Sequence, residues 1–185
     1  FVDFGSKNLS ENIDKAESLI RDAASKGSQI ILIQEFLIKL SDITDVILFS
    51  GNHDLIENNL ERIPNLEALT PKKSNIHYLK HTGKYEFGNI IFYLKSLEDN
   101  KPMPLSLTTN KVNIGLYHGM LKEIDHSSGS YSVEDFKHYD LTLLGDVHER
   151  QFLTDTIAYP GSLIQQNFGE NINNHGFIKW NIKNN

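Results

Sequence analysis

Three short apolar runs of this sequence each end in a polar cluster that contains a histidine. The runs "VILFS", "VNIGLY" and "DLTLLG" lead into "GNHD", "HG" and "GDVH". Continuous apolar runs of this length, bounded by turn residues, are typical of buried strands in a sheet that is covered on both faces. The pattern therefore favours a layered α/β fold whose strands deliver polar side chains to one edge.

The rest of the chain alternates between helix and strand patterns. Residues 10–27 place apolar side chains on one helical face and end at a glycine, which predicts an amphipathic helix. The apolar run "SQIILIQE" over residues 28–35 predicts another buried strand, and residues 132–139 fit a short helix. After Pro71 we expect further strands in "NIHYLK", "KYEFGNIIFYLKS", "KVNIGLYHG", "DLTLLGDVH", "DTIAYPGS" and "HGFIKWNIK". We expect a single domain over residues 1–185.

Composition excludes several kinds of function. The 185 residues contain no cysteine, so there is no disulfide, no thiolate zinc site and no cysteine nucleophile. The formal net charge of -6 gives no general reason to expect a nucleic-acid partner, but it does not exclude DNA. No apolar run is long enough to span a bilayer, and the first residues lack a signal-peptide pattern. We expect a cytoplasmic protein without a membrane partner.

The polar residues at the strand ends are candidates for a metal site. Ligand sites in open α/β sheets form outside the carboxyl ends of the strands. Imidazole, carboxylate and amide oxygen together suit manganese, iron or zinc. Each cluster alone also fits ordinary turn chemistry, because Asn and Asp side chains stabilise turns. Three clusters that directly follow buried strands favour a shared metal site. The remaining histidines are predicted to lie at the surface, and they are His77, His81, His126, His138 and His175.

The order of the motifs resembles that of calcineurin-like metallophosphoesterases. "GNHD", "YHG", "LLGDVHERQ", "YPGSLIQQNFGE" and "HGFIKW" follow one another in residues 36–185, and the last segments are most similar to SbcCD-type exonucleases and their phage relatives. The resemblance implies a β-sandwich flanked by helices (αββα), with two divalent metals, manganese first among them. It also implies a phosphate-ester substrate such as DNA, and a partner ATPase if the exonuclease branch applies.

The resemblance assigns roles to individual residues. Asn52 and His118 match ligands of the second metal, and Asp146 stands where the family usually has a further histidine ligand. His148 matches a ligand of the first metal. His53 matches the residue that stabilises the transition state or protonates the leaving oxygen, and Asp54 would orient it. The family's Asp-x-His and bridging Gly-Asp motifs are missing, so we expect weak or no catalysis.

The first segment, "FVDFGSKNLSENIDKAESLIRDAASKGSQIILIQE" over residues 1–35, resembles a different family, the nitrilase-type carbon-nitrogen hydrolases, in particular the N-carbamoylputrescine amidase branch. Glu35 would be the general base of that family's Glu-Lys-Cys triad, which this cysteine-free chain cannot assemble. One hypothesis places Asp3 and Glu35 near the two missing metal positions. The alternative leaves Glu35 as a strand-end carboxylate beside an incomplete site.

Two functions stay open for the whole chain: a metal-dependent phosphoesterase or nuclease, and a non-catalytic truncated or fused remnant of the metallophosphoesterase fold.

Overall fold

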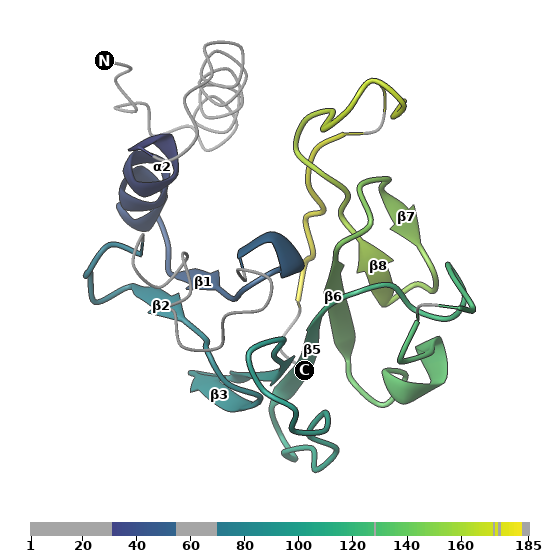
Figure 1. Ribbon diagram of the computed structural model, residues 1–185. Coiled ribbons are helices and arrows are strands. Elements are labelled where there is room, and N and C mark those ends of the chain that lie inside the picture. The colour runs from purple at the N-terminus through teal and green to yellow at the C-terminus, as the bar shows by residue number, and fades with distance from the viewer. Residues whose placement is uncertain (1–30, 55–69, 128, 172, 174, 183–185) are drawn as a thin grey trace. The chain divides into compact units, whose positions relative to one another are not determined.

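The computed structural model in Figure 1 describes residues 31–54, 70–127, 129–171, 173 and 175–182. The chain divides into two compact units. One consists of Phe1–Phe49 and Ile56–Leu79, and the other of Ser50–Leu55 and Lys80–Asn185. The described residues form an α/β fold with few helices, and its sheets contain both parallel and antiparallel strands. This confirms the expected α/β class.

The described part of the first unit is a helix beside two parallel strands. Helix α2 (Ile31–Ser41) precedes β1 (Val46–Leu48), which pairs with β2 (Ile76–Tyr78). A small core forms where Leu37 of the helix packs with the first residues of the two strands. Figure 1 shows α2 beside this two-stranded sheet. Among the described helices, none has the length and apolar character that a bilayer crossing requires.

The strand predicted over residues 28–35 is wrong, because the chain is helical from Ile31 to Ser41. The apolar pattern does not stop at Glu35 but continues at helical spacing, so that Phe36, Leu37 and Leu40 share the face that packs on the strands. Glu35 therefore lies within a helix and not at the end of a strand. Asp3 and the helix predicted over residues 10–27 lie outside the described residues.

The second unit contains a six-stranded mixed sheet in the order β3-β4-β5-β6-β8-β7. Strands β4, β5, β6 and β8 run parallel to one another, and β3 and β7 are antiparallel edge strands. The bounds are β3 (Gly83–Phe87), β4 (Ile90–Lys95), β5 (Val112–His118), β6 (Leu141–Gly145), β7 (Gln151–Phe152) and β8 (Ile157–Tyr159). Most of the predicted strands are confirmed. Residues 175–182, predicted as a strand, contain none in their described part.

The core of the second unit is rich in tyrosine and phenylalanine. Tyr93, Phe136 and Tyr159 are fully buried, and five interior strand positions of β5 are buried as well. The helix predicted over residues 132–139 is only a 3-10 turn, η2 (Val133–Asp135). Phe136 directly follows this turn and packs against the ring of Tyr117. One buried aromatic residue therefore anchors the segment without a longer helix.

Asp135 gives the second unit an acid-sensitive contact. The backbone N–H and the hydroxyl of Ser132 both donate to Oδ2 of Asp135 at 2.8 Å, and these bonds hold the pKa of Asp135 below its usual range. A depressed pKa in the folded state stabilises the fold above the unfolded pKa of about 3.9, and this stabilisation is lost as the pH falls through the folded value.

We therefore expect Asp135→Asn to lower the free energy of unfolding by about 1 kcal/mol near neutral pH, the typical net value of one hydrogen-bonded pair. The difference from the wild type should vanish at strongly acidic pH, where Asp135 is protonated. Urea unfolding followed by circular dichroism at several pH values measures it. Glu134→Gln, at the exposed neighbouring position, is the control. A difference that does not change with pH would contradict the expectation.

Candidate functional site

The structure brings three of the four predicted metal ligands together. Nε2 of His118 lies 3.1 Å from Oδ1 of Asn52 and 3.7 Å from Oδ1 of Asp146. Nδ2 of Asn52 donates to Oδ1 of Asp146 at 3.3 Å. All three residues belong to the second unit, although they lie far apart in the sequence. They form what we call the Asn52 cluster, defined as Asn52, His118 and Asp146.

Parallel strand pairing positions two members of this cluster. His118 is the last residue of β5, and it is aligned with Gly145, the last residue of β6. Asp146 follows directly. Because neighbouring parallel strands end at the same edge of a sheet, the side chains that follow them meet there. This is the convergence that the apolar runs of the sequence predicted.

Asn52 reaches the cluster from a short turn. It begins η1 (Asn52–Asp54), in which Oδ2 of Asp54 accepts a hydrogen bond from the N–H of Gly51 at 2.8 Å. Asp54 thus stabilises the turn, as the simpler interpretation of this motif held. The side chain of His53 lies outside the described residues, so its catalytic role stays a prediction.

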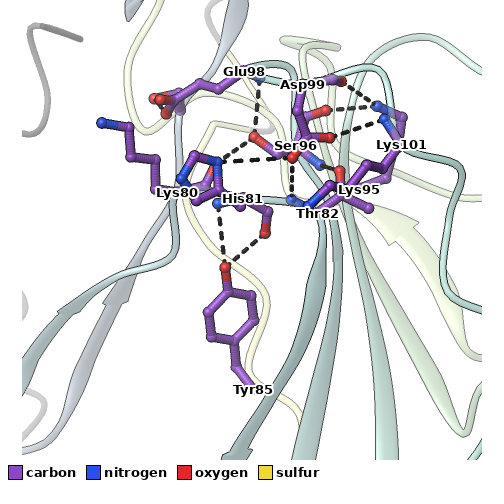
Figure 2. A network of polar contacts seen from close by, with 10 residues as sticks. Lys80, His81, Thr82, Tyr85, Lys95, Ser96, Glu98, Asp99 and Lys101 are labelled. Atoms are coloured by element: carbon purple, nitrogen blue, oxygen red, sulfur yellow. Dashed lines mark hydrogen bonds and ion pairs between the residues drawn. The ribbon is translucent and has the colours of Figure 1, made fainter.

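A polar network ties this turn to the sheet. The buried Ser50 donates to Oε1 of Glu98 at 2.7 Å, and Glu98 belongs to the network that Figure 2 shows around the start of β3 and the end of β4. In that network the N–H of Thr82 donates to Asp99 at 2.8 Å, and Ser96 donates its N–H to the Thr82 hydroxyl. Burial raises the pKa of Asp99, but hydrogen bonds led by those from Thr82 outweigh it and lower the pKa.

Two glycines leave room for the His118 ring. A Cβ atom on Gly51 would lie 2.6 Å from Cε1 of His118, and one on Gly145 would lie 2.6 Å from Nδ1. Real Cβ atoms essentially never come this close to a ring atom. The glycines of "GNHD" and "LLGD" therefore permit the ring to lie between the turn at Gly51 and the end of β6.

Asp146 has an unusual backbone conformation. Its φ of 96° lies in a region that residues with a side chain rarely adopt. Backbone strain of this kind costs on the order of 1–3 kcal/mol, and it is common at functional sites.

The side chains of His118 and Asp146 are 22% and 20% exposed, so both are accessible to solvent.

His148 belongs to a second group of contacts. Its Nδ1 lies 2.7 Å from Oε1 of Glu170, and its backbone carbonyl accepts a hydrogen bond from the N–H of Ser162 at 3.0 Å. Glu170 ends the "QQNFGE" motif, to which the sequence analysis gave no chemical role. The glutamate that ends this motif is the signal in the sequence, but only the fold shows that it contacts His148.

The chemistry of the Asn52 cluster fits one divalent cation. It offers an imidazole nitrogen, a carboxylate oxygen and an amide oxygen, which are ligands that manganese, iron and zinc accept. Among the described residues there is no group of three or more His, Asp or Glu that could hold a metal ion. Only His118 and Asp146 of the cluster belong to these residue types, and the amide oxygen of Asn52 is the third possible ligand of the cluster.

The other histidines vary in their surroundings. His81 and His126 are exposed, as expected. His138 packs against the ring of Tyr139 and is partly buried, which lowers its pKa. His175 lies between two loops, with Nδ1 3.0 Å from the hydroxyl of Ser162 and Nε2 2.7 Å from the carbonyl of Asn171. His138 and His175 are thus more enclosed than predicted.

Comparison with known proteins found a related sequence but no family. No protein family that was scanned matches the chain. The chain is similar to an uncharacterized protein of Acanthamoeba polyphaga mimivirus, with 37% identity over an alignment of 177 residues that covers 83% of this chain. The chain spans 13% of the length of that viral protein. The likeness therefore concerns one part of a much longer protein, and its description names no activity.

Proposed function

We propose that this chain is part of a metal-dependent phosphoesterase of the calcineurin-like type, with DNA phosphodiesters as one class of substrate. The convergence of Asn52, His118 and Asp146 at the carboxyl ends of parallel strands is the observation that carries the proposal. The order of the sequence motifs supports it. The αββα layering, the exonuclease branch and a partner ATPase are parts of the same proposal.

The three side chains of the cluster would together bind one cation. We propose manganese as this cation, with iron or zinc as alternatives. Nε2 of His118, Oδ1 of Asn52 and Oδ1 of Asp146 would be the ligands. The bond from Nδ2 of Asn52 to Asp146 orients the amide so that its oxygen faces His118. A bound divalent cation supplies a Lewis acid that polarises a phosphate oxygen and acidifies water. His53 would protonate the leaving oxygen.

Hydrolysis of bis(4-nitrophenyl) phosphate tests the proposal. Because the family's bridging metal motif is missing, we expect the chain to release nitrophenol only slowly with manganese, and the release to stop when EDTA is added. Asn52→Ala should lose at least about 10-fold in both rate and manganese affinity, because it removes one ligand and the orientation of the others. His53→Ala should lose rate but keep manganese affinity. The exposed His126→Ala is the control. A wild type that shows neither hydrolysis nor calorimetric manganese binding would contradict the proposal.

A second candidate is a non-catalytic remnant that keeps the fold and one cation. The small donor set favours it, because the described residues hold no larger group of His, Asp or Glu. Without a second cation the charge that develops on the phosphate is less well neutralised. Manganese binding with one site per chain and no turnover would identify this case. The same two measurements therefore separate the two candidates.

A further inference from the structure

We propose that Glu170 is a positioning residue for His148: it fixes the imidazole as the Nδ1–H tautomer and so presents Nε2 to a metal ion. The inference rests on the proposed function and goes further, because neither the motif resemblance nor the Asn52 cluster gives Glu170 a role. It concerns the one predicted metal ligand that lies outside the cluster.

The geometry of the pair determines where the proton lies. Nδ1 of His148 is 2.7 Å from Oε1 of Glu170. An ionised carboxylate can only accept hydrogen bonds, so Nδ1 carries a proton, and in the neutral imidazole Nε2 then keeps its lone pair. The His148 side chain is 42% exposed, whereas that of Glu170 is only 16% exposed. The carboxylate thus lies behind the ring, as in sites where a carboxylate orients a metal-binding histidine.

Glu170 is itself held in place on both oxygens. The N–H of Gln166 donates to Oε2 at 2.8 Å, and Nδ2 of Asn167 donates to Oε1 at 2.6 Å. The side chain of Gln165 donates to the Glu170 carbonyl at 3.0 Å. A carboxylate fixed in this way can impose one orientation on the imidazole.

The same segment also fixes the backbone of His148. The N–H of Ser162 donates to the His148 carbonyl at 3.0 Å. Gly161 has a φ of 76°, and a Cβ atom there would lie 2.8 Å from that carbonyl oxygen. Residues 161–170 therefore hold both the main chain and the ring of one histidine. A loop that served only to connect its neighbours would not require the hydrogen bond between Glu170 and Nδ1 of His148.

The tautomer can be measured without any metal. We expect nitrogen NMR of the full chain, with ¹⁵N-labelled histidine and no metal, to show His148 mainly as the Nδ1–H form. Glu170→Ala should give a mixture of the two tautomers, because nothing then selects one nitrogen. Glu170→Gln keeps the side-chain length and one acceptor oxygen, so its tautomer population should be intermediate. The exposed Glu149→Gln, directly after His148, is the control and should resemble the wild type.

Manganese titration by calorimetry tests the consequence. Glu170→Ala should bind the manganese ion that Nε2 of His148 contacts about 10 to 100-fold more weakly, the usual effect of removing a residue that orients a ligand, and should leave the ion of the Asn52 cluster unchanged. Glu149→Gln should bind as the wild type does. Thermal melting of each variant accompanies the titration, and if Glu170→Ala melts much earlier, Glu170→Gln replaces it in the comparison.

The outcomes separate the inference from the proposed function. If the wild type binds manganese and Glu170→Ala matches it in both affinity and His148 tautomer, the positioning role is wrong and the proposed function stands. If the wild type binds no manganese, the proposed function fails together with the metal-binding half of the inference. An unchanged tautomer in both Glu170 variants overturns the inference in either case.

Discussion

Replacing His118 with alanine is expected to weaken manganese binding by at least about 100-fold and to abolish manganese-dependent hydrolysis. Its Nε2 lies 3.1 Å from Oδ1 of Asn52 and 3.7 Å from Oδ1 of Asp146. Loss of an orienting residue already reduces metal affinity about 10 to 100-fold, and loss of a ligand should exceed that. Calorimetry and the phosphodiester assay measure the two effects.

Gly145→Ala tests the same site without removing any ligand. The new Cβ would fall 2.6 Å from Nδ1 of His118, so the ring must move away from Asn52 and Asp146. The main chain at Gly145 tolerates alanine, since its φ is not in the left-handed region. We therefore expect at least about a 10-fold loss of manganese affinity with little change in melting temperature.

Gly83→Ala is the matched control for this substitution. A Cβ there would meet only the ring of Tyr85, at an ordinary 4.0 Å, so it would not displace the His118 ring. It should leave manganese binding unchanged. Wild-type affinity in Gly145→Ala would show that the position of the His118 ring is not what the site requires.

Tyr159→Phe is expected to lower the free energy of unfolding by about 2–4 kcal/mol. Tyr159 is fully buried, and its hydroxyl accepts from the N–H of Leu121 at 3.0 Å and donates to the carbonyl of Gly119 at 2.9 Å. Phenylalanine fills the same space but leaves both backbone groups without this partner, and each such group is worth about 1–3 kcal/mol. Urea unfolding measures the difference.

The pKa of Tyr159 supports this expectation, because burial raises it to about 12. The phenol is therefore neutral and able to donate throughout the pH range of such an experiment. Tyr85→Phe is the control: its hydroxyl donates to the carbonyl of His81 at 2.6 Å in an exposed position, where water can replace it. Equal losses in the two variants would contradict the buried role of Tyr159.

Much of the second unit could be predicted from the sequence. The strands that end at His118 and Gly145 are continuous apolar runs bounded by turn residues, and such runs specify buried strands through their pattern alone. Because parallel strands end at one edge, the meeting of His118 and Asp146 followed from the same pattern. The position of Asn52 did not, because the strand before it, β1, belongs to the other sheet.

Other features depend on contacts that the sequence does not display. The first residues of helix α2 fall in the segment that the sequence predicts as a strand. A short, evenly apolar segment fits both the helical and the strand periodicity, and only its packing partners decide between them. The role of Glu170 depends on a bond across 22 residues to His148. The space that Gly145 leaves for His118 is a property of two neighbouring strand ends and not of either motif.

The backbone of Asp146 has a consequence for how this chain balances folding against function. A glycine would adopt φ 96° without strain. The fold is therefore less stable with aspartate at position 146 than it would be with glycine there. Glycine, however, has no carboxylate to receive the Asn52 amide. Keeping an aspartate here sacrifices stability for a chemical group, as proteins do where activity and stability conflict.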